Sequence, residues 1–377
     1  MRGYKGPVLT RAQGACFIAV MCAACSSSKL RAVPSDAGNP GDAGVEAASP
    51  SNETLTVFDA ARISSDSKAS NFQQLDGLVD FSGGPFSSVK LVTDLGTTCF
   101  PFESWANNRP PPGQNWPADC DAFDRNFEIS MDDAVSDAGE SPGLELIRAI
   151  TPFGGPMHVE RDLTAIANAQ PGEHRIRAHI TTYPDPAGLV TGSDAGWNVS
   201  LKVELTRGAP EQHPLAVIPL YYGDLTTADP TSATFTTPAG TTHAYIEYRT
   251  TGHGQATGSP FECSGPAEEF CSREHTIQLD GTTLQTFTPW RKCTSECTLM
   301  TTEGDAGFDY CAQNPCGAIA SVRAPRANWC PGTESPPLVL DAPELATPGT
   351  HEVSWQVSQI AMGGLVRVSL TYYAFGD

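Results

Sequence analysis

The stretch WNVSLKVEL, Trp197–Leu205, alternates apolar and polar side chains without a break. Successive side chains of a strand point to opposite faces, so this pattern predicts a β-strand with one buried face. LVRVSLTYY, Leu365–Tyr373, nearly repeats the pattern. Other short strand-like runs are SVKLV from Ser88, NFEISM from Asn126, LELIRAI from Leu144, RIRAHIT from Arg175, LAVIPLYY from Leu215, AYIEYR from Ala244, HTIQL from His275 and HEVSWQV from His351.

Turn-forming residues separate these runs, since the 377 residues include 35 Gly and 31 Pro. Many short strands between Gly/Pro loops predict an all-β protein built from antiparallel sandwiches. Only RDLTAIANA, Arg161–Ala169, has the pattern of a short helix. A domain boundary is predicted within LTRGAPEQHPLAV, where one strand pattern ends at Leu205 and another follows. The two predicted domains are residues 55–208 and 209–377.

The N-terminus has the features of an export signal. Arg2, Lys5 and Arg11 precede the short apolar stretch ACFIAVMCAAC, Ala15–Cys25. Residues 1–25 are the predicted signal, and its end, CAAC, resembles a bacterial lipobox, which predicts cleavage before Cys25 and lipid attachment at this cysteine; a plain secretory signal is the alternative. Residues 26–54 lack aromatic side chains and have few branched aliphatic ones, so we expect a disordered tether.

The formal net charge of −20 argues against nucleic acid or an anionic membrane surface as the partner. An uncharged polar ligand such as a sugar fits this charge better. Of the 12 cysteines, nine lie beyond the signal. Export implies an oxidising compartment, and no CxxC pair recurs at zinc-ribbon spacing, so disulfides are favoured over a metal site. We expect a protein without cofactor or metal, and a monomer.

Three cysteine-flanked motifs carry the candidate chemistry. CDAFDR, Cys120–Arg125, groups two acids, an aromatic side chain and a base; the alternative is the salt-bridged start of a strand. CSGPAEEFCSREHTI, Cys263–Ile277, holds Glu268 and Glu269, or forms an exposed acidic turn. RAPRANWCPG, Arg323–Gly332, offers Arg326 and Trp329 for a sugar, or forms a structural loop with one buried tryptophan.

In this order, the three motifs resemble those of the peptide-N-glycosidase F family, bacterial amidases that remove whole glycans from asparagine. RAITPF from Arg148, GAPEQHPLAVIPL from Gly208 and RTTGHG from Arg249 extend the resemblance over most of the chain from about residue 55. It implies two eight-stranded jelly rolls packed side by side, with a metal-free active site in the cleft between them.

The resemblance also implies roles for individual residues. It places the principal catalytic aspartate at Asp124 and a catalytic glutamate at Glu269. Arg125, Arg326 and Trp329 match residues that line the site. The implied disulfides are Cys99–Cys120, Cys263–Cys271 and Cys293–Cys330. Cys297, Cys311 and Cys316 remain, for which one pair and one free thiol is the simplest outcome.

The chain departs from the family at several positions. His179 and Thr181 stand where the family has a third glutamate and a tryptophan, so His179 either takes part in proton transfer or sugar binding or is an ordinary strand histidine. His253 and Gly154 replace two other tryptophans, and Phe123 replaces the aromatic residue before the aspartate. We include Phe123 and His253 among the expected substrate-binding residues.

These inferences predict an exported, lipid-anchored or secreted amidase that cleaves the bond between asparagine and an N-glycan. A carboxylate beside an arginine stays ionised as a base, and a second acid nearby has its pKa shifted the other way. The alternative is a glycan-binding surface lipoprotein that has the same fold and lacks turnover. The same fold also resembles that of copper monooxygenases, but the eight histidines form no HxH or HH pair, so copper is not expected.

Overall fold

The computed structural model describes residues 52–132, 143–257, 263–302 and 307–377. They belong to one compact unit, Pro50–Asp377. The predicted signal, the lipidation site Cys25 and most of the predicted tether therefore lie outside the described residues. Residues 52–54, which composition assigned to the tether, instead begin strand β1 (Asn52–Ser64), because their backbone pairs with residues 204–206 of β8 (Gly196–Arg207).

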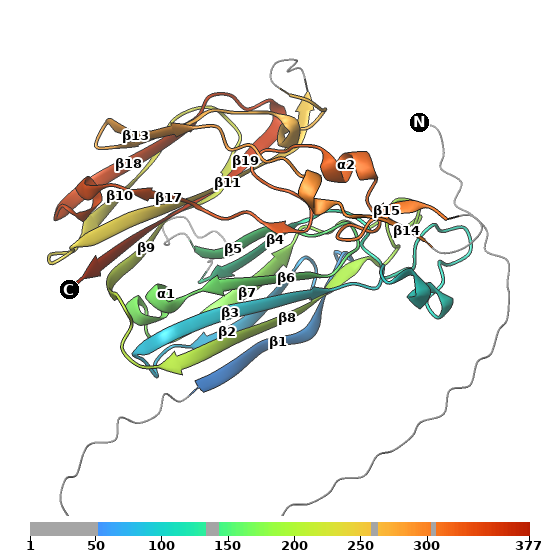
Figure 1. The fold of residues 1–377 in the computed structure, drawn as a ribbon, viewed down its shortest axis with the longest axis horizontal. Helices are drawn as coiled ribbons and strands as arrows, with labels where there is room; N and C mark the ends of the chain where they lie inside the picture. The colour runs from blue at the N-terminus through green and yellow to red at the C-terminus, as the bar shows by residue number, and fades with distance from the viewer. Residues whose placement is uncertain (1–51, 133–142, 258–262, 303–306) are drawn as a thin grey trace, which may run out of the picture. The chain divides into compact units, whose positions relative to one another are not determined.

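Strands from the first half of the chain form two antiparallel sheets (Figure 1). One sheet has the order β1-β8-β3-β6, and the other has the order β16-β5-β4-β7-β2. The further bounds are β2 (Gln74–Asp80), β3 (Phe86–Gly96), β4 (Asn126–Met131), β5 (Leu144–Ile150), β6 (Met157–Asp162), β7 (Glu173–Ile180) and β16 (Thr333–Glu334). The short β16 comes from the C-terminal part of the chain, so the two halves share a sheet.

Strand β8 contains the WNVSLKVEL stretch, and its apolar side chains all point into the core. Trp197, Val199, Leu201, Val203 and Leu205 are at most 3% exposed. They pack in one cluster with residues of the facing sheet, such as Phe127, Ile129 and Ile176. Burial of this alternating set sets the register of the strand, because a shift by one residue would turn every apolar side chain to solvent.

Strands from the second half form two further sheets, with the orders β10-β18-β12-β13 and β17-β11-β19-β9. The bounds are β9 (His213–Leu225), β10 (Thr231–Thr237), β11 (His243–Thr257), β12 (His275–Leu279), β13 (Thr282–Phe287), β17 (Leu338–Asp341), β18 (Gly349–Val357) and β19 (Met362–Gly376). A second apolar cluster, which includes Ile246, Trp355 and Leu370, fills the space between them. A small hairpin pairs β14 (Leu299–Thr301) with β15 (Asp309–Cys311). The all-β prediction is confirmed.

Helices are short. The predicted helix at Arg161–Ala169 is α1 (Thr164–Ala169), because Arg161 and Asp162 belong to β6. A second helix, α2 (Ile319–Arg323), was not predicted, since five residues are too few to show a helical period. Single turns of 3-10 helix are η1 (Phe102–Ala106), η2 (Glu268–Phe270), η3 (Thr294–Glu296) and η4 (Pro343–Ala346).

A polar seam joins the sheet that contains β4 and β5 to the sheet that contains β9, β11 and β19. The guanidinium of Arg367 in β19 donates to both carboxylate oxygens of Glu128 in β4, at 2.9 and 2.8 Å. Arg148 in β5 donates to the backbone carbonyl of Arg367 at 2.7 Å. Arg249 in β11 donates to the carbonyl of Glu145 at 3.2 Å. Buried charges with several directional bonds specify one relative placement of the two sheets more than they add stability.

Candidate active site

Asp124 and Glu269 meet at the side chain of Arg326. Nη2 of Arg326 lies 3.7 Å from Oδ2 of Asp124, and Nε lies 3.5 Å from Oε1 of Glu269. Asp124 stands two residues before β4, whereas Glu269 is the middle residue of η2. The acids remain partly accessible, with side-chain exposures of 16% and 23%, while Arg326 is only 1% exposed. Two acids 145 positions apart thus share one buried cation.

Arg326 is held by bonds that do not involve the acids. Nη1 donates to the carbonyls of Ser321 at 2.7 Å and Ala324 at 3.0 Å, at the end of α2. The rings of Phe270 and Trp329 lie 5.1 and 4.6 Å from its guanidinium carbon. Carbonyls at a helix end and aromatic faces both favour a cation. Arg326 is therefore fixed behind the acids, and this burial argues against the direct substrate-binding role that the sequence assigned to it.

Burial shifts both acids toward the neutral form. It raises the pKa of Asp124 to about 6, and the charges of Arg326 and Arg125 only partly oppose this effect. Burial and the negative charge of Asp124 raise the pKa of Glu269 to about 7, against the attraction of Arg326. Near neutral pH, Asp124 is then mostly ionised while Glu269 still holds a proton in a large share of molecules. Such a pair can take up and release protons close to physiological pH.

Arg125 has a different partner from the one that the sequence predicted. Its guanidinium forms a bidentate ion pair with Asp121, with three contacts of 3.0–3.1 Å, and the Asp121 side chain is 0% exposed. Residues 121–125 precede the strand, because β4 begins at Asn126. The charges of Arg326 and Arg125 both oppose the rise in the pKa of Asp124, and that of Arg326 has the larger effect. The adjacent Arg125 therefore does favour the ionised form of Asp124, and Arg326 favours it more strongly.

The predicted aromatic and histidine residues lie mostly behind the acids. Trp329 is 2% exposed and donates Nε1–H to the carbonyl of Gly252 at 3.0 Å. His253 stacks on Trp329 at 5.7 Å, and burial lowers the pKa of its imidazole to about 3. Neither ring is open to a sugar, which argues for a supporting role in place of the predicted substrate binding. Phe123 is half-buried and packs against Arg125 and Phe153.

His179 lies in β7, where its backbone pairs with Glu128 of β4 and with Gln74 of β2. Glu128 is the acid that binds Arg367 in the polar seam. The register thus places His179 next to the seam, and a catalytic role for it stays a prediction.

Disulfides frame the motifs that supply the two acids. The structure contains Cys99–Cys120, Cys263–Cys271 and Cys293–Cys330, the three pairs that the resemblance implies. Cys297–Cys311 forms a fourth, and Cys316 is the free cysteine of the described residues. Within the Cys263–Cys271 loop, Glu268 is 1% exposed and pairs with Arg273 at 2.7 Å. Of the two adjacent glutamates, only Glu269 therefore faces Arg326.

Sequence reasoning missed the polar contacts around the site and in the seam. Asp121, which binds Arg125, and the seam residues Glu128, Arg367 and Tyr222 belong to this group, and the hydroxyl of Tyr222 donates to Glu128 at 2.5 Å. Arg367 and Glu128 are 239 positions apart, so no local pattern connects them. Asp121 was visible in the CDAFDR motif, but its pairing with Arg125 depends on the irregular backbone before β4.

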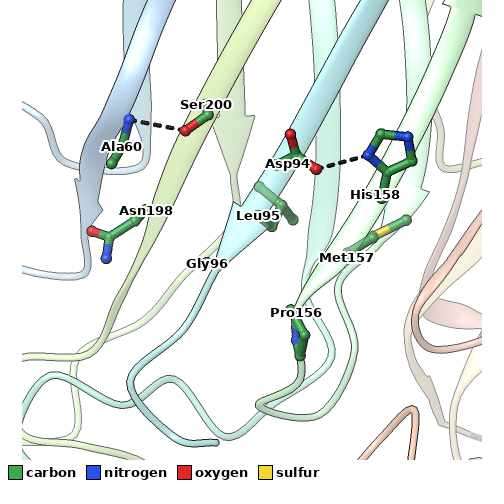
Figure 2. A pocket seen from close by; sticks show the side chains of 9 residues that line it. All are labelled: Ala60, Asp94, Leu95, Gly96, Pro156, Met157, His158, Asn198 and Ser200. Atoms are coloured by element: carbon green, nitrogen blue, oxygen red, sulfur yellow. Dashed lines mark hydrogen bonds and ion pairs between the residues drawn. The ribbon is translucent and has the colours of Figure 1, made fainter. Parts of the chain in front are cut away.

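A groove of about 490 Å³ lies elsewhere, on the sheet β1-β8-β3-β6. Figure 2 shows its lining, where His158 is hydrogen-bonded to Asp94, and Asn198 and Ser200 also line the wall. No predicted site residue lines this groove. Among the described residues, no group of three or more His, Cys, Asp or Glu side chains is placed to hold a metal, and no helix is both long and apolar enough to cross a membrane.

Comparisons with known proteins identify the class to which the fold belongs. Residues 221–370 match the family model described as peptide-N-glycosidase F, C terminal. The structure of PNGase F, a glycosylasparaginase from Flavobacterium meningosepticum, is similar with a TM-score of 0.61 and 17% identity, covering 86% of this chain and 96% of that one. A structure of peptide-N(4)-(N-acetyl-beta-D-glucosaminyl) asparagine amidase has a TM-score of 0.62, 17% identity and the same coverages.

A third similar structure, PNGF-II, has a TM-score of 0.60 and 18% identity; the match covers 86% of this chain and 65% of that one. No curated protein matches the sequence. The fold is that of the PNGase F structures. The sequence match to the peptide-N-glycosidase F family, which the order of the three motifs suggested, extends over residues 221–370.

Proposed function

We propose that this protein is an exported amidase that hydrolyses the amide bond between asparagine and the N-glycan of glycoproteins or glycopeptides. The observation that carries the proposal is the meeting of Asp124 and Glu269 at Arg326. Their partial exposure makes both carboxyls accessible to a substrate. The structure of PNGase F, a glycosylasparaginase, has a similar fold.

The chemistry requires two proton transfers. Asp124, ionised near neutral pH, accepts a proton from a water molecule while the oxygen of this water attacks the amide carbonyl carbon. The carbon–nitrogen bond of the amide then breaks, and the departing glycosylamine nitrogen receives a proton from Glu269. The products are an aspartate side chain and a glycosylamine. Arg326 holds the two carboxyls at one place and limits the rise of both pKa values.

The finer organisation belongs to the same proposal. We assign the two pairs of sheets to two jelly rolls, residues 55–208 and 209–377, with the acids contributed one from each. The four disulfides fit folding in an oxidising compartment. Lipid attachment at Cys25 would hold the folded part at a membrane surface.

Glycan release from a denatured glycoprotein tests the activity, with a high-mannose and a complex substrate in parallel. The wild-type protein should release glycan, and Asp124→Asn should lower kcat by at least about 100-fold. Glu103→Gln is the control, because Glu103 is an exposed acid in the Cys99–Cys120 loop that precedes Asp124. Equal release by wild type and Asp124→Asn, or no release by wild type, contradicts the proposal.

A glycan-binding protein without turnover is the second candidate. The specific observation in its favour is that His179 stands in β7 at the position where the resemblance places a third active-site glutamate. Binding of wild-type protein to a glycan array, together with no hydrolysis of either substrate, would select this function.

A further inference from the structure

Tyr183 presents an open aromatic ring beside the acid pair. The residue is 56% exposed, which makes it one of the most exposed large apolar side chains among the described residues. The guanidinium carbon of Arg125 lies 5.6 Å from the centre of its ring. Arg125 is the next residue after Asp124, so the ring of Tyr183 borders the site.

Hydrogen bonds and ion pairs hold both Arg125 and the loop that carries Tyr183, which runs from the end of β7 to β8. Arg125 is fixed by its bidentate pair with buried Asp121 and by the ring of Phe123 at 5.1 Å. The Tyr183 loop is tied to the Cys99–Cys120 loop, since Asn115 N–H donates to the carbonyl of Gly188 at 2.8 Å and Gly192 N–H donates to the carbonyl of Cys120 at 2.8 Å. The exposed ring therefore has a defined position relative to Asp124.

We propose that Tyr183 is a sugar-binding and specificity-determining residue that stacks on a pyranose ring of the glycan; this rests on the proposed function. Arg125 lies over one face of the Tyr183 ring, and the residue is 56% exposed, so we expect the opposite face to be open to a ligand. The apolar face of an acetamido sugar matches an aromatic ring. The nearby carboxyls of Asp124 and Glu269, and the net charge of −20, disfavour an anionic ligand.

Two control variants accompany Tyr183→Ala and distinguish an effect of the aromatic ring from an effect of the loop. Tyr183→Phe keeps the ring and removes the hydroxyl. Leu189→Ala is the matched control, because Leu189 is 51% exposed in the same loop and the hydrogen bond from Asn115 uses its backbone carbonyl. Neither change, nor Tyr183→Ala, removes a buried contact, so all variants should keep the thermal midpoint of the wild type.

Calorimetric titration of the full-length chain with N,N′-diacetylchitobiose tests the proposal. This disaccharide lacks the asparagine amide bond, so the proposed activity does not consume it, and each change is made in the wild-type chain. Tyr183→Ala should weaken binding of this disaccharide about tenfold, whereas Tyr183→Phe and Leu189→Ala should leave it unchanged. A peptide that contains unglycosylated asparagine is the second probe, and its binding should not respond to Tyr183→Ala.

Unchanged disaccharide binding by Tyr183→Ala overturns the proposal, as does absence of disaccharide binding by the wild-type protein. An equal loss with Leu189→Ala, or a loss confined to the peptide probe, also overturns it. If wild type releases no glycan while disaccharide binding still depends on Tyr183, the amidase proposal fails and the sugar-binding role of Tyr183 stands.

Discussion

Arg367 in β19 and Glu128 in β4 form a two-point ion pair across the polar seam, with distances of 2.9 and 2.8 Å. Asp124 lies four residues before Glu128 in the same segment, and Glu269 contacts the second pair of sheets through η2, which packs on β11 and β19. The ion pair therefore fixes the sheet next to Asp124 against the sheets next to Glu269. We expect its loss to affect both the folding free energy and the distance between the acids.

Arg367→Met should destabilise the fold by about 3 kcal/mol, because it leaves the carboxylate of Glu128 buried without its main partner. The free energy of unfolding from denaturant titration measures this. The double variant Glu128→Leu/Arg367→Met should recover part of the loss, since an apolar pair does not carry an unpaired charge. We expect kcat of the double variant to be at least about tenfold lower than that of the wild type, because the seam positions the acids. A kcat at the wild-type value would contradict this role of the seam.

The same ion pair predicts how stability depends on pH. Burial alone would raise the pKa of Glu128, but Arg367 and Arg148 outweigh it and lower the pKa to about 2, below the ordinary value of 4.5. A lowered carboxyl pKa contributes stability that is present above about pH 4.5 and is lost as the pH falls toward 2. Thermal midpoints between pH 6 and 2 should show this decrease. In Arg367→Met the contribution from Glu128 should be much smaller, and an identical acid limb would contradict the assignment.

The acid pair predicts a bell-shaped pH dependence of kcat/KM. Asp124 must be ionised to act as a base, so activity should fall below about pH 6. Glu269 must hold a proton for the leaving group, so activity should fall above about pH 7. The two apparent pKa values belong to the pair as a whole. Glu269→Gln should lower the maximum and remove the alkaline limb while the acid limb remains; an unchanged alkaline limb would assign it to another group.

Asp121 is expected to be a positioning residue. Asp121→Asn keeps the shape of the side chain but removes the charge that binds Arg125, at a site where the carboxylate is fully buried. We expect a loss of about 3 kcal/mol in unfolding free energy and a rise in KM, because Arg125 and the adjacent Tyr183 ring lose their fixed position. Asp119→Asn is the control, since Asp119 bonds the Asn108 side chain in the same loop. Similar KM values for both variants would refute the role.

The Cys99–Cys120 disulfide should stabilise the loop that leads to Asp124. It closes a segment with a sequence separation of 21 residues, so its removal in Cys99→Ala/Cys120→Ala should cost about 3 kcal/mol of unfolding free energy. The midpoint of chemical denaturation measures this change. Cys297→Ala/Cys311→Ala, which opens a loop with a separation of 14 residues in the β14–β15 region, should cost slightly less and leave kcat unchanged. A larger effect on kcat from Cys297→Ala/Cys311→Ala than from Cys99→Ala/Cys120→Ala would contradict the assignment of the first disulfide to the Asp124 loop.

The strand periods in the sequence predicted most of the fold. In WNVSLKVEL the alternation is local, and burial of every second residue in β8 follows from the pleat of a single strand. Helix α2 and strand β16 were missed because five and two residues show no period, and the predicted runs also omit β1, β2, β6, β10, β13, β14, β15 and β17. The end of the predicted tether was misplaced because residues 52–54 pair with β8 through their backbone, which their composition does not reveal.

The sequence by itself determined the strands, the motifs that carry Asp124 and Glu269, and, through the resemblance, the disulfide pairs. Only the tertiary structure decided that Arg326 is shared by both acids, that Arg125 pairs with Asp121, and that Trp329 lies buried while Tyr183 lies open. The physical reason is that a strand period reports on neighbours two residues apart. Which charges meet across sheets depends instead on the packing of segments more than a hundred residues apart, and that packing sets burial, pKa and access together.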